Sequence, residues 1–181
     1  MLHFEALAER LRRSLVQILP GGSGVIWDAS GFIVTNAHVA TGKSAEIVDA
    51  SGKRSLARVI LRDRERDLAV LQAVQPLFGE PAEIGDSDSL RAGQLVLAVG
   101  NPLGITGALA AGVIHTVGPL ARRNWIQADV RLAPGNSGGI LADASGRVVG
   151  IPAMIFKGLA LAVPSNDADA FVRRVLLKKT A

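Results

Sequence analysis

Short apolar runs, separated by Gly, Pro, Asp and Ser, fill the chain from residue 20 to about residue 163. Runs of this length between turn residues predict β-strands, because a helix would need a longer stretch with a 3.6-residue period. Helical periodicity is confined to the ends, where Leu7, Leu11 and Leu15 recur every four residues and a second apolar face follows Pro164. The pattern therefore predicts an all-β fold, an antiparallel barrel or sandwich, with a helix at each end.

Two nearly identical connectors indicate that the β region has two similar halves. Asp28-Ala29-Ser30-Gly31 and Asp143-Ala144-Ser145-Gly146 both stand between apolar runs and have the composition of hairpin turns. The segment 77–93 contains Pro81 and Gly85 and shows no sustained periodicity. We therefore expect this segment to cross from one half to the other.

Composition excludes several kinds of chemistry. The 181 residues include no cysteine, so disulfides, thiolate catalysis and thiolate metal sites are excluded. We expect no metal and no cofactor. The opening helix mixes charged and apolar residues, unlike a signal peptide, and no apolar run approaches the roughly 20 residues of a membrane helix. As the sequence stands this predicts a cytoplasmic protein without a membrane span, although an exported mature domain restarted at a methionine would look the same.

The chain is basic, with a formal net charge of +4. Part of the excess lies at the two ends, in Arg10, Arg12, Arg13, Arg173, Arg174, Lys178 and Lys179. A basic surface could attract nucleic acid. Solvated helix faces explain these charges better, because five Phe, two Trp and no Tyr leave few side chains to stack on bases. We expect no nucleic-acid partner.

The stretch Gly135-Asn136-Ser137-Gly138-Gly139 places one hydroxyl in a backbone that few side chains obstruct. Glycine permits positive φ and close approach, so this serine can sit on a tight turn with its amide hydrogens pointing outward. Such a turn can present a nucleophile beside an anion-binding cradle. A serine hydroxyl is not ionised at neutral pH, so it needs a base, usually a histidine oriented by an acid.

Three histidines could supply that base. His3 falls in the opening helix and His115 in a strand, where exposed structural positions explain both. His38 follows an apolar strand that ends on polar residues, so it stands at a strand-to-turn junction. Taken alone, His38 would more simply be a structural histidine, but the serine motif makes it the candidate base.

The run from Arg62 to Asp67 contains three carboxylates. Most of this run reads as solvated charge, since alternating surface pairs contribute little to stability. Asp67 differs because Leu68-Ala69-Val70-Leu71 follows it, so it marks the entry into a buried strand. A carboxylate there is costly to desolvate unless a group such as an imidazole N–H binds it. His38, Asp67 and Ser137 are thus candidates for a hydrolytic triad, in one of its known orders.

Three segments resemble the signature motifs of the chymotrypsin-fold serine proteases of the HtrA/Deg type. They are Thr35-Asn36-Ala37-His38-Val39, Asp67-Leu68-Ala69-Val70-Leu71 and Gly135-Asn136-Ser137-Gly138-Gly139. Further matches are Gly22-Ser23-Gly24-Val25-Ile26, Gly100-Asn101-Pro102-Leu103-Gly104 and Val163-Pro164-Ser165-Asn166. The similarity therefore runs from about residue 5 to residue 175.

The resemblance implies two six-stranded antiparallel β-barrels of the chymotrypsin or trypsin-like kind, with N-terminal and C-terminal helices, in a single protease domain. The implied boundaries are 1–18 for the N-terminal helix, 19–80 for the first barrel, 81–93 for the linker, 94–164 for the second barrel and 165–181 for the C-terminal helix. No PDZ domain is expected in this chain. Family members often form trimers, so monomer and trimer both stay open.

The resemblance also implies a serine endopeptidase that cleaves unfolded or extended polypeptides through an acyl-enzyme intermediate. His38 would act as general base, Asp67 would orient it and Ser137 would attack, while Gly135, Asn136 and Ser137 would form the oxyanion hole. The residues implied for the substrate pocket are Leu132, Ile155, Gly158 and Leu159. Because neither Leu132 at the floor of this pocket nor Ile155 at its wall carries a carboxylate, we expect a small or medium aliphatic side chain before the cleaved bond.

Two short loops depart from the regulated members of the family. One lies between Ile155 and Gly158, and the other contains Arg122 and Arg123. The alternative function is therefore a catalytically silent module of the same fold, which would bind extended peptides along a strand edge.

Overall fold

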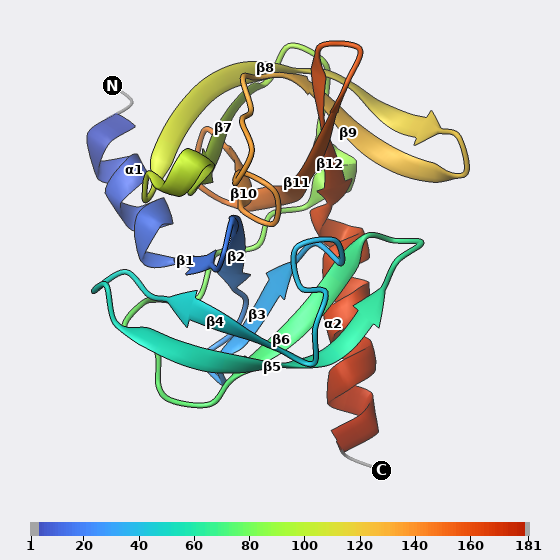
Figure 1. Cartoon of the computed structure of the whole chain (residues 1–181). Coiled ribbons are helices and arrows are strands. Elements are labelled where there is room, and N and C mark those ends of the chain that lie inside the picture. Colours follow the sequence, from blue (N-terminus) through green and yellow to red (C-terminus); the bar gives the residue numbers. More distant parts are fainter. Residues whose placement is uncertain (1–3, 180–181) are drawn as a thin grey trace.

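β-Strands and two terminal helices make up the chain in the computed structural model, which describes residues 4–179 (Figure 1). Residues 1–3 and 180–181 lie outside the described part of the chain. The expectation for His3 therefore falls outside the described residues, as do the side chains of Leu176, Lys178 and Lys179.

The first half of the chain closes into a barrel of six antiparallel strands. Its strands are β1 (Leu15–Ile18), β2 (Gly22–Ile26), β3 (Phe32–Thr35), β4 (Ser44–Val48), β5 (Arg54–Asp63) and β6 (Leu68–Ala73). They are hydrogen-bonded in the order β1-β2-β3-β6-β5-β4. Alternate residues of a strand point to one face, and those facing inward form an aliphatic core that includes Val16, Ile18, Ile33, Ile47 and Leu71.

The second half forms a matching barrel. Its strands are β7 (Leu95–Gly100), β8 (Ala108–Leu120), β9 (Arg123–Asp129), β10 (Ile140–Asp143), β11 (Val148–Phe156) and β12 (Leu159–Pro164), in the order β10-β11-β12-β9-β8-β7. Its core includes Val96, Ile114, Ile126, Leu141 and Val149. Short 3-10 turns, η1 (Ser87–Ser89) and η2 (Pro102–Gly104), lie before and after β7. The expectation of two six-stranded antiparallel barrels is confirmed.

A third cluster of buried side chains joins the two barrels. It includes Val25, Val34 and Val70 from the first barrel and Leu97, Val99 and Ile140 from the second. The barrels lie one above the other in Figure 1, with this cluster between them. Packing of this kind fixes the relative placement of loops from the two barrels, because close-packed apolar surfaces do not slide freely.

The C-terminal helix contacts both barrels. α2 (Ser165–Lys179) lies against β11 and β12 of the second barrel and β6 of the first (Figure 1). Its apolar stripe of Ala168, Phe171, Val172 and Val175 is buried in the cluster that joins the barrels. The N-terminal helix α1 (Phe4–Arg13) buries Ala8 and Leu11. Within residues 4–179, no helix combines the length and the apolar character that crossing a membrane requires.

The expected extent of the N-terminal helix needs a correction. The helix ends at Arg13, and residues 15–18, which were expected to belong to it, form strand β1 of the first barrel. This Leu-Val-Gln-Ile run pairs with β2 along one edge and with β4 along the other, and three of its four residues are buried. Burial of β-branched side chains in the barrel favours the strand over continued helix.

Candidate active site

His38 lies on the turn that follows β3. The strand is buried throughout, and its last residue, Thr35, donates a hydrogen bond from its hydroxyl to the Ser23 carbonyl at 2.6 Å. The amides of Val39 and Ala40 both donate to the Asn36 carbonyl, which closes a tight turn. The turn leaves the His38 side chain 49% exposed, so its ring is anchored on one side and open to a cleft on the other.

Asp67 supplies the carboxylate that binds this histidine. The Nδ1 atom of His38 lies 2.8 Å from Oδ2 of Asp67 and 3.0 Å from Oδ1, and the His38 backbone N–H donates to Oδ1 at 3.1 Å. Asp67 is buried and directly precedes the buried β6. The hydrogen bond to Asp67 raises the pKa of His38 above its usual 6.5, burial opposes this, and the Asp67 charge adds to the rise.

The other two carboxylates of the run have different partners. Asp63 accepts hydrogen bonds from the backbone and side chain of Arg66, while Glu65 is exposed. Among the three candidates from the sequence, the structure therefore places Asp67 against His38. His115, by contrast, lies exposed in β8.

Ser137 lies in the loop between β9 and β10, whose shape depends on glycine. Gly135 has φ +103° and Gly138 has φ +80°, values that side chains with a Cβ rarely adopt. A Cβ on Gly138 would also collide with the Thr35 hydroxyl and the Ser23 carbonyl, because this loop packs directly on the first barrel. The Ser137 hydroxyl donates to the Ala153 carbonyl at 3.1 Å.

His38 and Ser137 line one cleft of about 510 Å³. Its walls come from both barrels, with Gly21 and Thr41 on the first and Pro134 on the second. The packing of the two barrels thus places a histidine and a serine that are 99 residues apart in the sequence (137 − 38) on the same cleft.

The backbone amides of the serine loop differ in their partners. The N–H groups of Asn136, Gly138 and Gly139 donate to the carbonyls of Ala133, Pro152 and Asn136, respectively. The Pro134 carbonyl accepts a hydrogen bond from the Leu103 amide at 2.9 Å. Because the carbonyl and the N–H of a trans peptide point in opposite directions, the Gly135 N–H points away from Leu103. Within residues 4–179, the N–H groups of Gly135 and Ser137 donate to no protein acceptor.

A second hollow of about 200 Å³ lies beside Ser137, and its lining is mostly apolar. It is lined by Leu132, Ala133, Pro134, Asn136, Ser137, Met154 and Ile155. Of the four residues expected to form a substrate pocket, Leu132 and Ile155 line this hollow. The other two, Gly158 and Leu159, do not line it. Leu159 pairs with Phe156, the residue after Ile155, and Gly158 lies in the turn that joins β11 to β12.

Two residues near the site were not anticipated from the sequence. Ala153 matters through its carbonyl, which every residue type has, so no sequence signal could reveal it. The Asn36 side chain donates a hydrogen bond to the Asp67 carbonyl at 2.9 Å. Its position two residues before His38 is the sequence feature from which a role near the site could have been predicted.

The double barrel, with a His–Asp pair on one barrel and a serine on a glycine-rich loop of the other, defines the class of chymotrypsin-like peptidase folds. The comparisons with known proteins agree with this class. Residues 22–151 match the family described as "Trypsin-like peptidase domain", and the chain belongs to that family.

The similar proteins are serine proteases of the HtrA type. The chain is 36% identical over 178 residues to "Serine protease Do-like HtrA" of Lactobacillus helveticus, a match that covers 87% of this chain and 43% of that protein. It is 35% identical over 158 residues to "Periplasmic serine endoprotease DegP" of Salmonella typhimurium, covering 80% of this chain and 33% of that protein. The chain therefore spans less than half the length of these relatives.

A solved structure shares the fold. The structure described as "HtrA-type protease AlgW with decapeptide" superposes with a TM-score of 0.88 at 26% identity, covering 96% of this chain and 67% of the other. The resemblance in the three sequence motifs to HtrA-type proteases is thereby confirmed.

Proposed function

We propose that this chain is a serine endopeptidase domain that uses His38, Asp67 and Ser137. The observation that carries the proposal is the 2.8 Å contact between His38 Nδ1 and Asp67 Oδ2, in a cleft that Ser137 also lines. With Nδ1 donating to the carboxylate, the other ring nitrogen is left as the acceptor that a general base needs. The names of the related proteins support the same activity.

The reaction would begin with transfer of the Ser137 proton to the free nitrogen of His38. Rotation about the Ser137 Cα–Cβ bond would first move the hydroxyl from the Ala153 carbonyl toward the imidazole. The serine oxygen would then bond to the carbonyl carbon of the substrate, and His38 would return the proton to the departing amine. Water would hydrolyse the resulting ester, with His38 again acting as base.

The amides of Gly135 and Ser137 would stabilise the negative oxygen that develops on the substrate. Both lack protein acceptors within the described residues, whereas the Asn136 amide is used by Ala133. We therefore propose two donors for the oxyanion hole, not three. Removal of one such donor typically costs about 3 kcal/mol of transition-state stabilisation.

The apolar hollow beside Ser137 would receive the side chain before the cleaved bond. Its volume of about 200 Å³ and its lining by Leu132, Met154 and Ile155 suit a small or medium aliphatic group. A lysine or arginine would lose its hydration there without gaining a carboxylate partner. Polypeptides in unfolded or extended form are the proposed substrates.

Labelling with a fluorophosphonate probe tests the proposal. The unaltered protein should be labelled at Ser137 and should degrade casein, while Ser137→Ala should do neither. Ser145→Ala, which removes an exposed hydroxyl in the β10–β11 turn, is the matched control and should behave like the unaltered protein. Saturable peptide binding without labelling or turnover would overturn the proposal in favour of a silent peptide-binding module.

The compartment stays a prediction. The sequence favours the cytoplasm as it stands, whereas a relative is named as periplasmic. Fractionation of the source cells, with an antibody against this domain, would decide between the two. Monomer and trimer likewise stay open, and sedimentation would separate them.

A further inference from the structure

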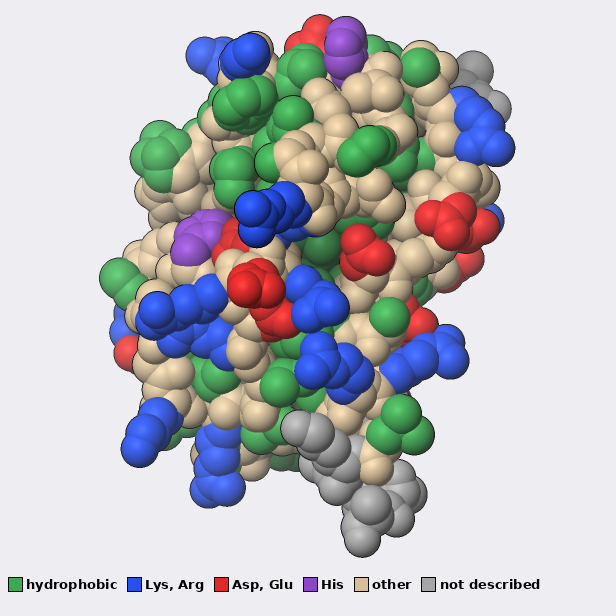
Figure 2. All heavy atoms as spheres, turned by 90° about the vertical axis from the view of Figure 1, so that its right-hand side faces the viewer, with side chains coloured by type: hydrophobic (Ala, Val, Ile, Leu, Met, Phe, Trp, Pro, Cys, Tyr) green, Lys and Arg blue, Asp and Glu red, His purple; other side chains and the backbone are tan. Residues whose placement is uncertain are grey.

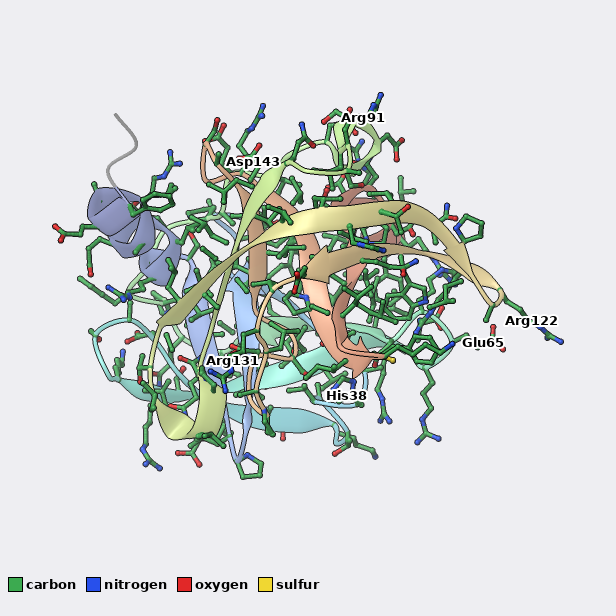
Figure 3. All side chains as sticks on the ribbon, turned by 90° about the horizontal axis from the view of Figure 1, so that it is seen from above. His38, Glu65, Arg91, Arg122, Arg131 and Asp143 are labelled. Atoms are coloured by element: carbon green, nitrogen blue, oxygen red, sulfur yellow. The ribbon has the colours of Figure 1, made fainter. Side chains whose placement is uncertain are left out.

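The loop that ends at Asp67 receives a hydrogen bond from the opposite barrel. Arg123, the first residue of β9, donates from Nη1 to the carbonyl oxygen of Glu65 at 2.7 Å. Glu65 lies in the turn between β5 and β6 of the first barrel, two residues before Asp67. In Figure 3 Glu65 lies close to the tip of the β8–β9 hairpin, while Arg122 points away from the body of the molecule.

The Arg123 side chain is held in place by its own barrel. Its guanidinium carbon lies 3.9 Å from the centre of the Trp125 ring, and Trp125 is buried. A guanidinium stacked on an aromatic face loses less freedom when it forms a hydrogen bond, because its plane is already oriented. Burial lowers the pKa of Arg123, and the charges of Asp67 and Asp63 oppose that effect.

Asp67 adopts a left-handed backbone conformation. Its φ of +51° is uncommon for a residue with a Cβ, although Asp tolerates it better than most, and surrounding contacts help to hold it. Within its own barrel, its N–H donates to the Arg64 carbonyl at a long 3.3 Å, and its carbonyl accepts from the Asn36 side chain. The contact from Arg123 to Glu65 adds a restraint from the second barrel.

We propose that Arg123 is a positioning residue for the catalytic pair: by binding the Glu65 carbonyl from its stacked position on Trp125, it holds the turn that presents the Asp67 carboxylate to His38. This inference deepens the proposed function and rests on it. Arg123 would act through Asp67 without touching the substrate. Its loss would leave the fold intact but would let the carboxylate drift from the imidazole.

Other charges surround the same turn. Asp63 binds Arg66 through both carboxylate oxygens, and Arg64 and Glu65 are exposed. From α2, Asp167 has a raised pKa, caused first by burial and then by Asp88, with Arg66 acting in the opposite sense. Figure 2 shows acidic and basic side chains intermixed on this side of the molecule. A substitution at Arg123 removes none of these groups, so a change in the His38 pKa can be attributed to the loss of the Arg123 side chain.

Arg123→Met tests the proposal, because methionine keeps an apolar stem over Trp125 and removes the guanidinium. Arg122→Met is the matched control, since it alters the neighbouring exposed arginine at the hairpin tip. The NMR resonance of the His38 imidazole, assigned by its absence in His38→Gln, is followed as the pH is varied. We expect the His38 pKa to fall in Arg123→Met, because displacement of the Asp67 carboxylate outweighs the rise that loss of the Arg123 charge alone would cause, and to stay unchanged in Arg122→Met. An unchanged or higher His38 pKa in Arg123→Met, with thermal unfolding showing a folded protein, would overturn the proposal.

Kinetics supply an independent test. Arg123→Met should lower kcat about tenfold with little change in KM, the loss expected for one hydrogen bond from a charged donor. In an Asp67→Asn background the same substitution should not lower kcat further, because the Asp67 carboxylate through which Arg123 acts is already absent. Additive losses would show that Arg123 acts elsewhere and would overturn the proposal. If the unaltered protein lacks peptidase activity, the proposed function fails, while the NMR titration still decides whether Arg123 positions Asp67.

Discussion

The Ser23 hydroxyl donates a hydrogen bond to the Gly135 carbonyl at 2.7 Å and accepts one from the Asn101 amide at 2.9 Å. Ser23 belongs to the first barrel, and the other two residues belong to the second. All three are buried, so this polar contact ties the serine loop to the opposite barrel where water does not compete.

Replacing Ser23 with alanine should destabilise the protein by about 2 kcal/mol, because a buried carbonyl and a buried amide lose their partner. Urea denaturation followed by tryptophan fluorescence measures this change. Ser30→Ala, at an exposed position in the β2–β3 turn, should alter stability by less than about 0.5 kcal/mol. Equal stabilities for the two variants would contradict the importance of the Ser23 contact.

The pH dependence of activity should follow His38. Since the hydrogen bond to Asp67 raises the His38 pKa, the acid limb of kcat/KM should have its midpoint above about 6.5, the ordinary histidine value. Asp67→Asn should shift this midpoint downward and reduce kcat by roughly 10⁴-fold, as loss of the orienting acid does in such triads. Rates of peptide cleavage between pH 5 and pH 9 provide the measurement, and an acid limb that Asp67→Asn leaves in place would refute the assignment.

Stability should depend on pH through the same pair. A pKa raised on folding means that the folded state binds the His38 proton more tightly than the unfolded state. The stabilisation is therefore complete below about pH 6.5 and is lost as pH rises through the folded pKa. Urea midpoints measured across that range should show this loss in the unaltered protein but not in Asp67→Asn. The exposed His115→Gln control should keep the pH dependence of the unaltered protein.

Two glycines with similar φ angles should respond very differently to alanine. Gly138 (φ +80°) has the first barrel against it, whereas Gly52 (φ +84°) has nothing within 4 Å of the position a Cβ would occupy. Gly52→Ala should cost about 1 kcal/mol from backbone strain alone, while Gly138→Ala should cost more than about 3 kcal/mol once steric overlap is added. Thermal unfolding of both variants, with probe labelling of Ser137, would test this. Similar losses would show that the serine loop can move away from the first barrel.

The apolar hollow should control which bonds are cleaved. Ile155→Ala enlarges it, so cleavage after larger side chains such as phenylalanine should rise about tenfold relative to cleavage after valine, the usual discrimination for a few methylene groups. Mass spectrometry of digests of a peptide library gives the ratio. Ile105→Ala removes a similarly exposed isoleucine that does not line the hollow and should leave the ratio unchanged. An unaltered ratio in Ile155→Ala would place the specificity pocket elsewhere.

Much of the fold and the central site could be predicted because their signals are local. Alternating apolar residues and turn residues mark most strands, and each member of the His38, Asp67 and Ser137 set lies in its own short motif. Strand β1 was missed because a four-residue run directly after a helix resembles its last turn, and only pairing with β2 and β4 distinguishes the two. The Arg123 contact with Glu65 spans 58 residues and exists only because the barrels are packed together. Sequence patterns within either segment carry no trace of it.

The helix α2 lies against both barrels, and Phe171 is buried where they meet. Opening the groove between the barrels would pull this aromatic ring into water, so a gaping motion carries a large hydrophobic penalty. If the groove cannot widen, a polypeptide substrate must change its own conformation to bind there. The proposed peptidase would therefore favour flexible substrates over rigid, folded ones.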